Sequence, residues 1–578
     1  MPTAPPTNET FLVAFMHAAG LLLLLADLPF ACSLSASVTL RSSLPIVPDG
    51  GSLVIYWDTD LPTDPATDVI TRTCGPVVDL ADVIDAIPVA AATPDTPGGG
   101  ARFTNNVNLR CDYDFRLVRG WNSSAEKQDV SALRELGRVT VPVEGGPNAP
   151  GQGHISLADR DDEMWVGWVS GRQPQAAADT PTVRWGTSSG HYTRSTAAAR
   201  NSSTTYTASD MCNAPANTTS QIMWRFPGWF HHVLLRGLLP STTYYYVYGN
   251  ERDGWSRERA FSSKPRRSAA VTTDVAVRFL AYGDQDWDDP APGSPSTAAY
   301  ALRDVLDGWN SFILHFGDIS YGEGDVSDWD HWAHQNEPYA TRAPYIVSLG
   351  NHEMDYVSGG ERSPTGGGPT GFHPGEGWGN DSNGECGVPV FHRFRAPSNG
   401  NSIAWYSFDY GVVHVVQMSS EHDWTRGSPQ YKWLEADLAA VDRSVTPWVV
   451  VTAHRMMYST QSDASTGPAL MRAQLEDLVI QHKVNLFLCG HQHSYERFCP
   501  VAQGKCVEDG RSAPTYINAG TAGAGIDYKD WFNSNISLVR SKQWGYLRVS
   551  ATAHDLTVQF VDNSLGEEWD EVVLLPWM

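Results

Sequence analysis

The chain has 578 residues, which is more than one hydrophobic core holds and predicts two or three domains. Aromatic residues make up 11% of it and charged residues 18%, a composition that excludes a disordered chain. The formal net charge of −24 argues against a nucleic-acid partner or an anionic membrane, so an anionic substrate would need local positive charge, most simply from a bound metal.

The first recognisable feature of the chain is an apolar run at residues 11–25 (FLVAFMHAAGLLLLL). It is short for a membrane span and is followed by small residues at 31–33, so residues 1–35 are predicted to be a cleaved secretory signal. Residues 1–10 contain no Lys or Arg, which leaves an uncleaved anchor or a wrong start site as alternatives. We therefore expect a secreted protein, extracellular or vacuolar, without a stable membrane span.

Sequons and cysteines fit an oxidising compartment. The candidate glycosylation sites are Asn122, Asn201, Asn217, Asn380 and Asn535. No CxxC pair occurs, which argues against a thiolate zinc site. Three disulfides can form, namely Cys499–Cys506, Cys74–Cys111 and Cys212–Cys386. Cys489 lies in an apolar run and is predicted to be a buried free thiol.

Residues 36–153 are predicted to form a β-rich extension. The alternating segment 52–57 (SLVIYW) indicates a strand, residues 94–100 are rich in turn formers, and residues 145–153 (GGPNAPGQG) are typical of a linker. No catalytic residues stand out in this region.

Residues 154–270 are predicted to form an antiparallel sandwich, because short strand-like segments alternate with turn signals. These segments are 164–170, 182–185, 204–208, 230–235 and 243–248. Residues 238–246 (LLPSTTYYY) resemble the corner of fibronectin type III domains in which a tyrosine hydroxyl binds the backbone. The aromatic residues could instead form a ligand-binding face, but core packing is the favoured interpretation.

Residues 275–578 alternate strand-like runs with helical stretches at 297–309, 432–441 and 468–482, which predicts a layered α/β domain. Five of its strand-like runs end in metal-binding residues. They are 277–282 before Gly283-Asp284, 312–316 before Gly317-Asp318 and Tyr321, 345–349 before Gly350-Asn351-His352, 448–452 before Ala453-His454-Arg455, and 484–489 before Gly490-His491-Gln492-His493. A small residue before each ligand lets the chain leave the sheet sharply while its neighbour reaches a shared centre.

Each of these segments alone has an ordinary interpretation as a turn, a core histidine or a surface loop. Together, their oxygen and imidazole ligands suit iron, manganese or zinc better than calcium or magnesium. The ligands are too many for one ion and about right for two ions that share Asp318. Two adjacent metals activate water and stabilise both oxygens of a displacement at phosphorus.

The same segments resemble a known family. GD at 283–284, GDISY at 317–321, GNHE at 350–353, AHR at 453–455 and GHQHSYER at 490–497 are similar to the five blocks of calcineurin-like metallophosphoesterases. Tyr321 points to the purple acid phosphatases, and SDMC at 209–212 and GW at 228–229 resemble their longer, plant-type members. The resemblance implies a multidomain protein in which a fibronectin type III-like sandwich precedes a four-layer αββα catalytic domain.

The resemblance also implies roles for individual residues. A ferric ion would be held by Asp284, Asp318, Tyr321 and His493, with Tyr321 giving a violet charge-transfer band. A divalent partner, which is zinc, manganese or ferrous iron, would be held by Asp318, Asn351, His454 and His491. Metal-activated hydroxide would attack phosphorus, and His352 would protonate the leaving oxygen. Asn351 and His352 would contact the substrate, and family members suggest a homodimer.

Two features depart from the family pattern. Asp286 stands where the first block has glycine, and it could crowd the site, repel an anionic substrate, act as an extra ligand or turn to solvent, the last being favoured by the cost of burying a charge. Residues 456–467 lack the extra histidines of the short plant enzymes, so Arg455 and Tyr458 are candidates for phosphate contacts. The Gly-rich segment 359–384 is predicted to lie at the rim of the site.

The leading hypothesis is a secreted acid phosphatase that acts on small phosphate monoesters. A nucleotide pyrophosphatase or phosphodiesterase is the alternative within the same class. A binding or adhesion protein with a decayed phosphatase domain is the alternative from another class, although the complete ligand set weighs against it.

Overall fold

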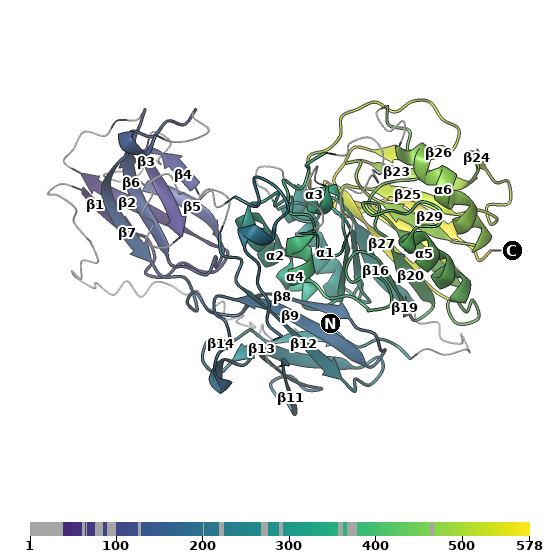
Figure 1. Cartoon of the computed structure of the whole chain (residues 1–578), viewed down its shortest axis with the longest axis horizontal. Coiled ribbons are helices and arrows are strands. Elements are labelled where there is room, and N and C mark those ends of the chain that lie inside the picture. The colour runs from purple at the N-terminus through teal and green to yellow at the C-terminus, as the bar shows by residue number, and fades with distance from the viewer. Residues whose placement is uncertain are drawn as a thin grey trace, which may run out of the picture.

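The computed structural model describes residues 38–59, 64, 66–74, 85–89, 100–124, 129–199, 202–218, 225–266, 276–287, 293–355, 362–366, 379–462 and 467–577. The expected signal at 1–35, the sequon at Asn201 and most of the Gly-rich rim segment lie outside these ranges. Within them, none of the helices is both long and apolar enough to cross a bilayer. Figure 1 shows a β-domain at one end of the molecule and a second one packed beneath an α/β domain.

The N-terminal region is β-rich, as the alternating pattern predicted, and its strands form a small two-sheet sandwich. One sheet has the order β1 (Val38–Ser42), β2 (Gly51–Thr59), β5 (Gly100–Asn106), and the other β4 (Asp85–Pro88), β3 (Val69–Cys74), β6 (Tyr113–Arg119), β7 (Arg134–Val141), with a 3-10 turn at Val130–Ala132. Ile55, Phe103 and Phe115 are buried between the sheets. The domain contacts the α/β domain through an ion pair between Arg110 and Asp330.

The second domain is the predicted sandwich. Its sheets are β12 (Trp229–Arg236), β9 (Glu163–Ser170), β8 (Gly151–Leu157), and β11 (Arg194–Ala197), β10 (Thr182–Gly186), β13 (Thr243–Asn250), β14 (Gly254–Trp255), with β15 (Arg259–Ser262) paired to β13. The hydroxyl of Tyr244 accepts a hydrogen bond from the backbone N–H of Leu239 (2.9 Å), which confirms the predicted tyrosine corner. Tyr246 and Tyr248 are fully buried, so the strand aromatics pack the core.

One predicted strand of this domain is wrong. Residues 204–208 form no strand, because only Thr204 pairs, in a single bridge with Phe230, and a 3-10 turn at Ala208–Asp210 follows. The side chain of Asp210 accepts from the backbone N–H of Thr207 (2.7 Å) and stabilises this turn instead. Another 3-10 turn lies at Ala177–Asp179.

The α/β domain contains two mixed sheets. The six-stranded sheet has the order β18 (Tyr345–Ser348), β17 (Ile313–Phe316), β16 (Val277–Tyr282), β27 (Gly545–Ala551), β28 (Leu556–Asp562), β29 (Glu567–Leu574). The eight-stranded sheet has the order β19 (Tyr406–Tyr410), β20 (Val413–Gln417), β21 (Trp448–Thr452), β22 (Leu486–Cys489), β25 (Thr515–Ala519), β23 (Tyr495–Ala502), β24 (Lys505–Cys506), with β26 (Ser537–Ser541) paired to β23.

The helices complete a four-layer architecture, in agreement with the predicted fold class. They are α1 (Gly293–Leu306), α2 (Val326–Ala340), α3 (Asn351–Met354), α4 (Val388–Arg393), α5 (Pro429–Ala440) and α6 (Gly467–Gln481). Both faces of the inner strands are covered: in β21, Val450 belongs to the core shared with the other sheet, and Val449 and Val451 to the core beneath the outer helices. Burial on both faces explains why these strands are continuously apolar. The predicted helices exist with ends shifted by a few residues, and α2 was not predicted.

The three predicted disulfides are present, with Cα–Cα distances of 5.5 Å for Cys74–Cys111, 6.1 Å for Cys212–Cys386 and 5.6 Å for Cys499–Cys506. Cys489 is buried and free, as predicted. Among the described sequons, Asn122 and Asn535 are exposed, and Asn217 and Asn380 are half-buried.

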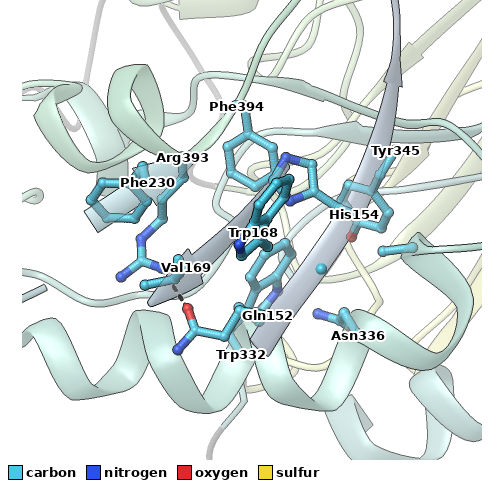
Figure 2. Close-up of a pocket in the computed structure, with 13 residues that line it drawn as sticks. Gln152, His154, Trp168, Val169, Phe230, Trp332, Asn336, Tyr345, Arg393 and Phe394 are labelled. Carbon is cyan, nitrogen blue, oxygen red and sulfur yellow. Dashed lines mark hydrogen bonds between the residues drawn. The ribbon is translucent and has the colours of Figure 1, made fainter. Parts of the chain in front are cut away.

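The second sandwich packs against the α/β domain through β8 and β9. A small pocket of about 20 Å³ lies at this interface. Figure 2 shows that His154 and Trp168 of the sandwich line it together with Trp332 and Tyr345 of the α/β domain. Gln152 accepts a hydrogen bond from Arg393 at its edge (3.0 Å). Aromatic residues line much of this pocket, and polar contacts such as the ion pair between Arg259 and Glu337 also join the two domains.

Candidate metal centre

The seven predicted metal ligands come together at the carboxyl ends of parallel strands. β16, β17 and β18 run parallel in one sheet, and β21 and β22 run parallel in the other. Potential ligand atoms lie within 4.8 Å of one another in two groups, which are Asp284, Asp318, His493 and Asp318, His454, His491. The groups share Asp318, as expected for a bridging carboxylate between two ions.

The backbone at the ligands is unusual. Four of the seven have positive φ angles, namely Asp284 (62°), Asp318 (51°), Tyr321 (49°) and His491 (68°). Residues other than glycine rarely adopt this conformation, and where they do it is concentrated at functional sites. The chain therefore has an unusual backbone conformation at four of the predicted ligands themselves.

The glycines that precede the ligands allow close approach. A Cβ atom on Gly350 would lie 2.1 Å from Oδ1 of Asp318, and one on Gly490 would lie 2.2 Å from Oδ2 of Asp284. Gly350 has a φ of −108°, so conformational freedom is not what requires glycine there. Each of these glycines makes room for the carboxylate of another strand end.

Tyr321 and His493 lie together on one side of Asp284. The Tyr321 hydroxyl is 2.9 Å from Nε2 of His493 and 3.4 Å from Oδ1 of Asp284. Nδ1 of His493 donates to the carbonyl of Gly525 (2.5 Å), which leaves Nε2 available to a metal. Burial and the charges of Asp318 and Asp284 raise the pKa of Tyr321 well above its usual value, so a phenolate here requires a cation.

Asn351, His454 and His491 form the other side. Oδ1 of Asn351 is 2.8 Å from Nε2 of His454 and 2.8 Å from Nδ1 of His491. The amide of Asn351 donates to Asp381 (3.1 Å), which directs its oxygen toward the two histidines. Nδ1 of His454 donates to the carbonyl of Phe316 (3.1 Å) and leaves Nε2 facing Asp318. These hydrogen bonds orient the donors for one shared ion.

Glu353 holds the strand ends together, a role that the sequence analysis did not assign. It is 1% exposed and accepts from the backbone N–H groups of Asp318 (2.9 Å), Ile319 (2.7 Å) and Gly350 (2.9 Å). The GNHE segment contained this residue, but its partners Asp318 and Ile319 are more than 30 residues away in the chain.

His352 lies next to the centre with an acidic partner. Its Nδ1 is 2.7 Å from Oε1 of Glu323, its Nε2 is 3.9 Å from Oδ2 of Asp318, and its side chain is 24% exposed. Burial disfavours the imidazolium, but Asp318 and Glu323 outweigh it and raise the pKa of His352 to about 10. Glu323 was missed by the sequence analysis, although a carboxylate two residues after Tyr321 was a possible signal.

Arg455 and Tyr458, the suggested phosphate contacts, have other partners. Arg455 is buried in ion pairs with Glu421 (3.0 Å) and Asp355 (2.9 Å). The Tyr458 hydroxyl donates to Glu476 (2.5 Å) and accepts from the N–H of Gly504 (2.9 Å). The hydrogen-bonding groups of both residues thus bind the protein itself.

Asp286 is half-buried, with a φ of 63°. Its carboxylate accepts from the N–H of Trp287 (2.7 Å), and its charge contributes to the raised pKa of Tyr321. It therefore lies close enough to act on the centre electrostatically, although it belongs to neither of the two ligand groups found in the described part of the chain.

Comparison with known proteins places this centre in a class. Residues 268–495 match the calcineurin-like phosphoesterase family, residues 150–263 match the N-terminal domain of purple acid phosphatases, and residues 513–571 match the iron/zinc purple acid phosphatase-like protein C family. The fold and the site are thus those of a metallophosphoesterase, a hydrolase.

The relatives define the family further. A probable inactive purple acid phosphatase 27 of Arabidopsis thaliana is 31% identical over 87% of this chain and 82% of its own length. A nucleotide pyrophosphatase/phosphodiesterase of Hordeum vulgare is 32% identical over 50% of this chain and 78% of its own length. The structure of a purple acid phosphatase from yellow lupin (Lupinus luteus) seeds superposes with a TM-score of 0.76 at 26% identity, covering 92% of this chain and 95% of that one. This chain belongs to the purple acid phosphatase family, which confirms the resemblance found in the sequence.

Proposed function

We propose that this protein is a secreted, binuclear metal-dependent acid phosphatase that hydrolyses phosphate monoesters. The observation that carries the proposal is the pair of ligand groups that share Asp318. The three disulfides and the exposed sequons at Asn122 and Asn535 support passage through the secretory pathway.

The donor set fits two different ions. Asp284, Asp318, Tyr321 and His493 offer two carboxylates and a phenol, which favour a highly charged ion such as ferric iron. Asp318, Asn351, His454 and His491 offer two imidazoles and two oxygens, which suit zinc, manganese or ferrous iron. When bound, a metal pair supplies positive charge for the phosphate and lowers the pKa of water, the nucleophile.

His352 and Glu323 provide the acid. Glu323 accepts from Nδ1–H of His352, so the ring presents Nε2–H toward the centre. The partly exposed ring can reach the substrate and donate this proton to the leaving alkoxide oxygen, while the raised pKa keeps it protonated at acid pH. Asn351, whose amide borders the same space, is the second expected substrate contact.

Hydrolysis of a nucleotide diphosphate bond or a phosphodiester is the second candidate function. The similarity to the barley nucleotide pyrophosphatase/phosphodiesterase favours it, because the two proteins are 32% identical over 305 residues. Several relatives are named as probably inactive phosphatases, which keeps a non-catalytic binding role in view. The complete ligand set with its supporting hydrogen bonds argues for catalysis.

The test is the visible spectrum and metal content of the purified protein, together with hydrolysis of an aryl phosphate. We expect two metals per chain including iron, and a broad visible band that Tyr321→Phe abolishes. A colourless protein with two other metals would retain a phosphoesterase but remove the ferric assignment. A metal-free protein without activity would overturn the proposal.

A further inference from the structure

The loop at residues 522–533, between β25 and β26, is hydrogen-bonded to His493, one of the predicted metal ligands. The backbone N–H of His493 donates to Oδ2 of Asp527 (3.1 Å), and the N–H of Asp527 donates to the carbonyl of His493 (3.0 Å). Gly525 accepts from Nδ1 of the same histidine. The first half of the loop therefore has a fixed position beside the centre.

The second half of the loop is fixed as well. The N–H of Phe532 donates to the carbonyl of Thr460 (2.8 Å), and the N–H of Ser462 donates to the carbonyl of Asp530 (2.9 Å). The ring of Trp531 lies 4.9 Å from Nζ of Lys542. Residue 528 is thus presented between two anchored segments, so a ligand that contacts it need not order the loop.

Tyr528 occupies this position with its side chain in solvent. It is 81% exposed, the highest value among the large hydrophobic and aromatic side chains of the described residues. Its immediate neighbour Asp527 binds the backbone of a metal ligand. An aromatic ring on a rigid loop at the edge of a reaction centre is a typical stacking surface.

The proposed acid and the histidine that holds the loop both lie beside the ring of Tyr321. The ring of Tyr321 is 4.3 Å from that of His352 and 6.1 Å from that of His493, measured between centroids. His352, the proposed acid, and the loop bound to His493 therefore flank the same tyrosine. A leaving group that starts at His352 can extend past Tyr321 toward Tyr528.

The charges on the two sides of the centre differ. Beside His352 and Asn351 lie the carboxylates of Glu323 and Asp381. Beside the loop lies the cation of Lys542, which has no ion-pair partner among the described residues. Asp527 and Asp530 lie in the same loop, so Lys542 offsets part of their negative charge.

We propose that Tyr528 stacks on the base of a nucleoside phosphate, which would be the substrate class of this phosphatase. The inference rests on the proposed function. Tyr528 is next to Asp527, which binds the backbone N–H of His493. The Nε2 atom that would bind the metal lies at the other end of the His493 side chain, so Tyr528 is separated from the metal centre by the length of that side chain. The aromatic group must therefore be separated from the phosphate by a spacer, which a nucleotide has in its pentose and an aryl phosphate lacks.

The experiment compares hydrolysis of adenosine 5′-monophosphate and glycerol 3-phosphate by the metal-loaded protein. We expect Tyr528→Ala to raise KM for the nucleotide about tenfold, the effect of losing one base stack, and to leave glycerol 3-phosphate within about twofold. Tyr528→Phe should behave as the wild type, because stacking does not need the hydroxyl. Trp569→Ala, at an exposed aromatic residue on β29, is the matched control and should change neither substrate.

Equal effects of Tyr528→Ala on both substrates, or none on the nucleotide, would overturn the inference while leaving the phosphatase intact. Hydrolysis of glycerol 3-phosphate but not of the nucleotide would do the same. If the wild type hydrolyses neither, the proposed function fails. Calorimetric binding of adenosine 5′-monophosphate then decides: weaker binding by Tyr528→Ala supports the stacking site, and equal binding overturns it.

Discussion

Two groups of buried histidines in this protein respond oppositely to burial. At the metal centre the pKa is raised, to about 10 for His352, about 9 for His454 and about 8 for His493. In the sandwich and its interface with the α/β domain the pKa is lowered, to about 4 for His154, about 3 for His231 and about 4 for His392. Burial disfavours the imidazolium in every case, so the neighbours decide the outcome.

The neighbours differ in charge. The histidines of the centre face the carboxylates of Asp284, Asp318 and Glu323, which outweigh desolvation. The cations of Arg395 and Arg393 instead add to the desolvation of His154. His491 is the exception at the centre, because burial and the adjacent Arg455 lower its pKa. The comparison shows how a candidate metal centre differs from an ordinary histidine-rich core. Its histidines are surrounded by an excess of carboxylates, whose negative charge two bound cations would neutralise.

The largest expected effect comes from breaking the contact between His352 and its carboxylate partner. His352→Ala removes the proposed acid, and we expect kcat to fall on the order of 10²-fold or more for a substrate with a poor leaving group. Glu323→Gln keeps the ring but weakens its orientation, so a fall of roughly tenfold is expected. Steady-state kinetics with an alkyl and a nitrophenyl phosphate measures both.

A nitrophenolate leaves without protonation, so both variants should be less impaired on the nitrophenyl ester. Equal losses on the two esters would contradict the assignment of His352 as the acid. Metal content, measured on the same preparations, should stay at the wild-type level.

The interface histidines predict a loss of stability in acid. His154 has a pKa of about 4 in the fold against 6.5 for the ordinary side chain, so above pH 6.5 it is neutral in both states. As the pH falls from 6.5 to 4, the unfolded chain binds a proton that the fold excludes, and the free energy of unfolding decreases by up to about 3 kcal/mol. His154→Asn should make this decrease shallower, as measured by urea unfolding at several pH values.

His414 is the matched control of opposite sign. It lies between Asp409 (2.7 Å) and Asp437 (3.0 Å), which overcome burial and raise its pKa to about 9. Its contribution is complete below pH 6.5 and is lost as the pH rises toward 9. His414→Gln should therefore lower the free energy of unfolding by a constant amount below pH 6.5 and flatten its decline between pH 6.5 and 9, without changing the slope in acid. If His154→Asn leaves the decrease in the free energy of unfolding between pH 6.5 and 4 unchanged, other groups control unfolding in acid.

The smallest expected effect concerns Asp286, a carboxylate that the centre does not need for its ligands. Asp286→Gly removes a negative charge near Tyr321, so we expect KM for a phosphate monoester to fall about threefold with little change in kcat. Asp286→Asn should give a similar change if charge is responsible. A loss of bound metal in both variants would instead identify Asp286 as a ligand.

The sequence alone predicted which residues gather at the candidate centre. Five of the seven predicted ligands directly follow a small residue at the end of an apolar run, and Tyr321 and His493 lie within three residues of one of them. Because parallel strands bring their carboxyl ends to one edge, this local pattern was enough to predict that these residues gather. Most strands of the sandwich and its tyrosine corner were also predictable, because turn residues and strand alternation are local features. The disulfide pairings were predicted as well, although Cys212 and Cys386 lie 174 residues apart.

Only the tertiary structure decided which groups pair around the centre. Arg455 meets Asp355 across 100 residues of chain and Glu421 across 34, so it is held in buried ion pairs. Glu353 links two strand ends, Glu323 reaches His352, and the rim loop of Tyr528 attaches to His493. These contacts depend on how separate loops pack together, and no spacing in the sequence encodes that.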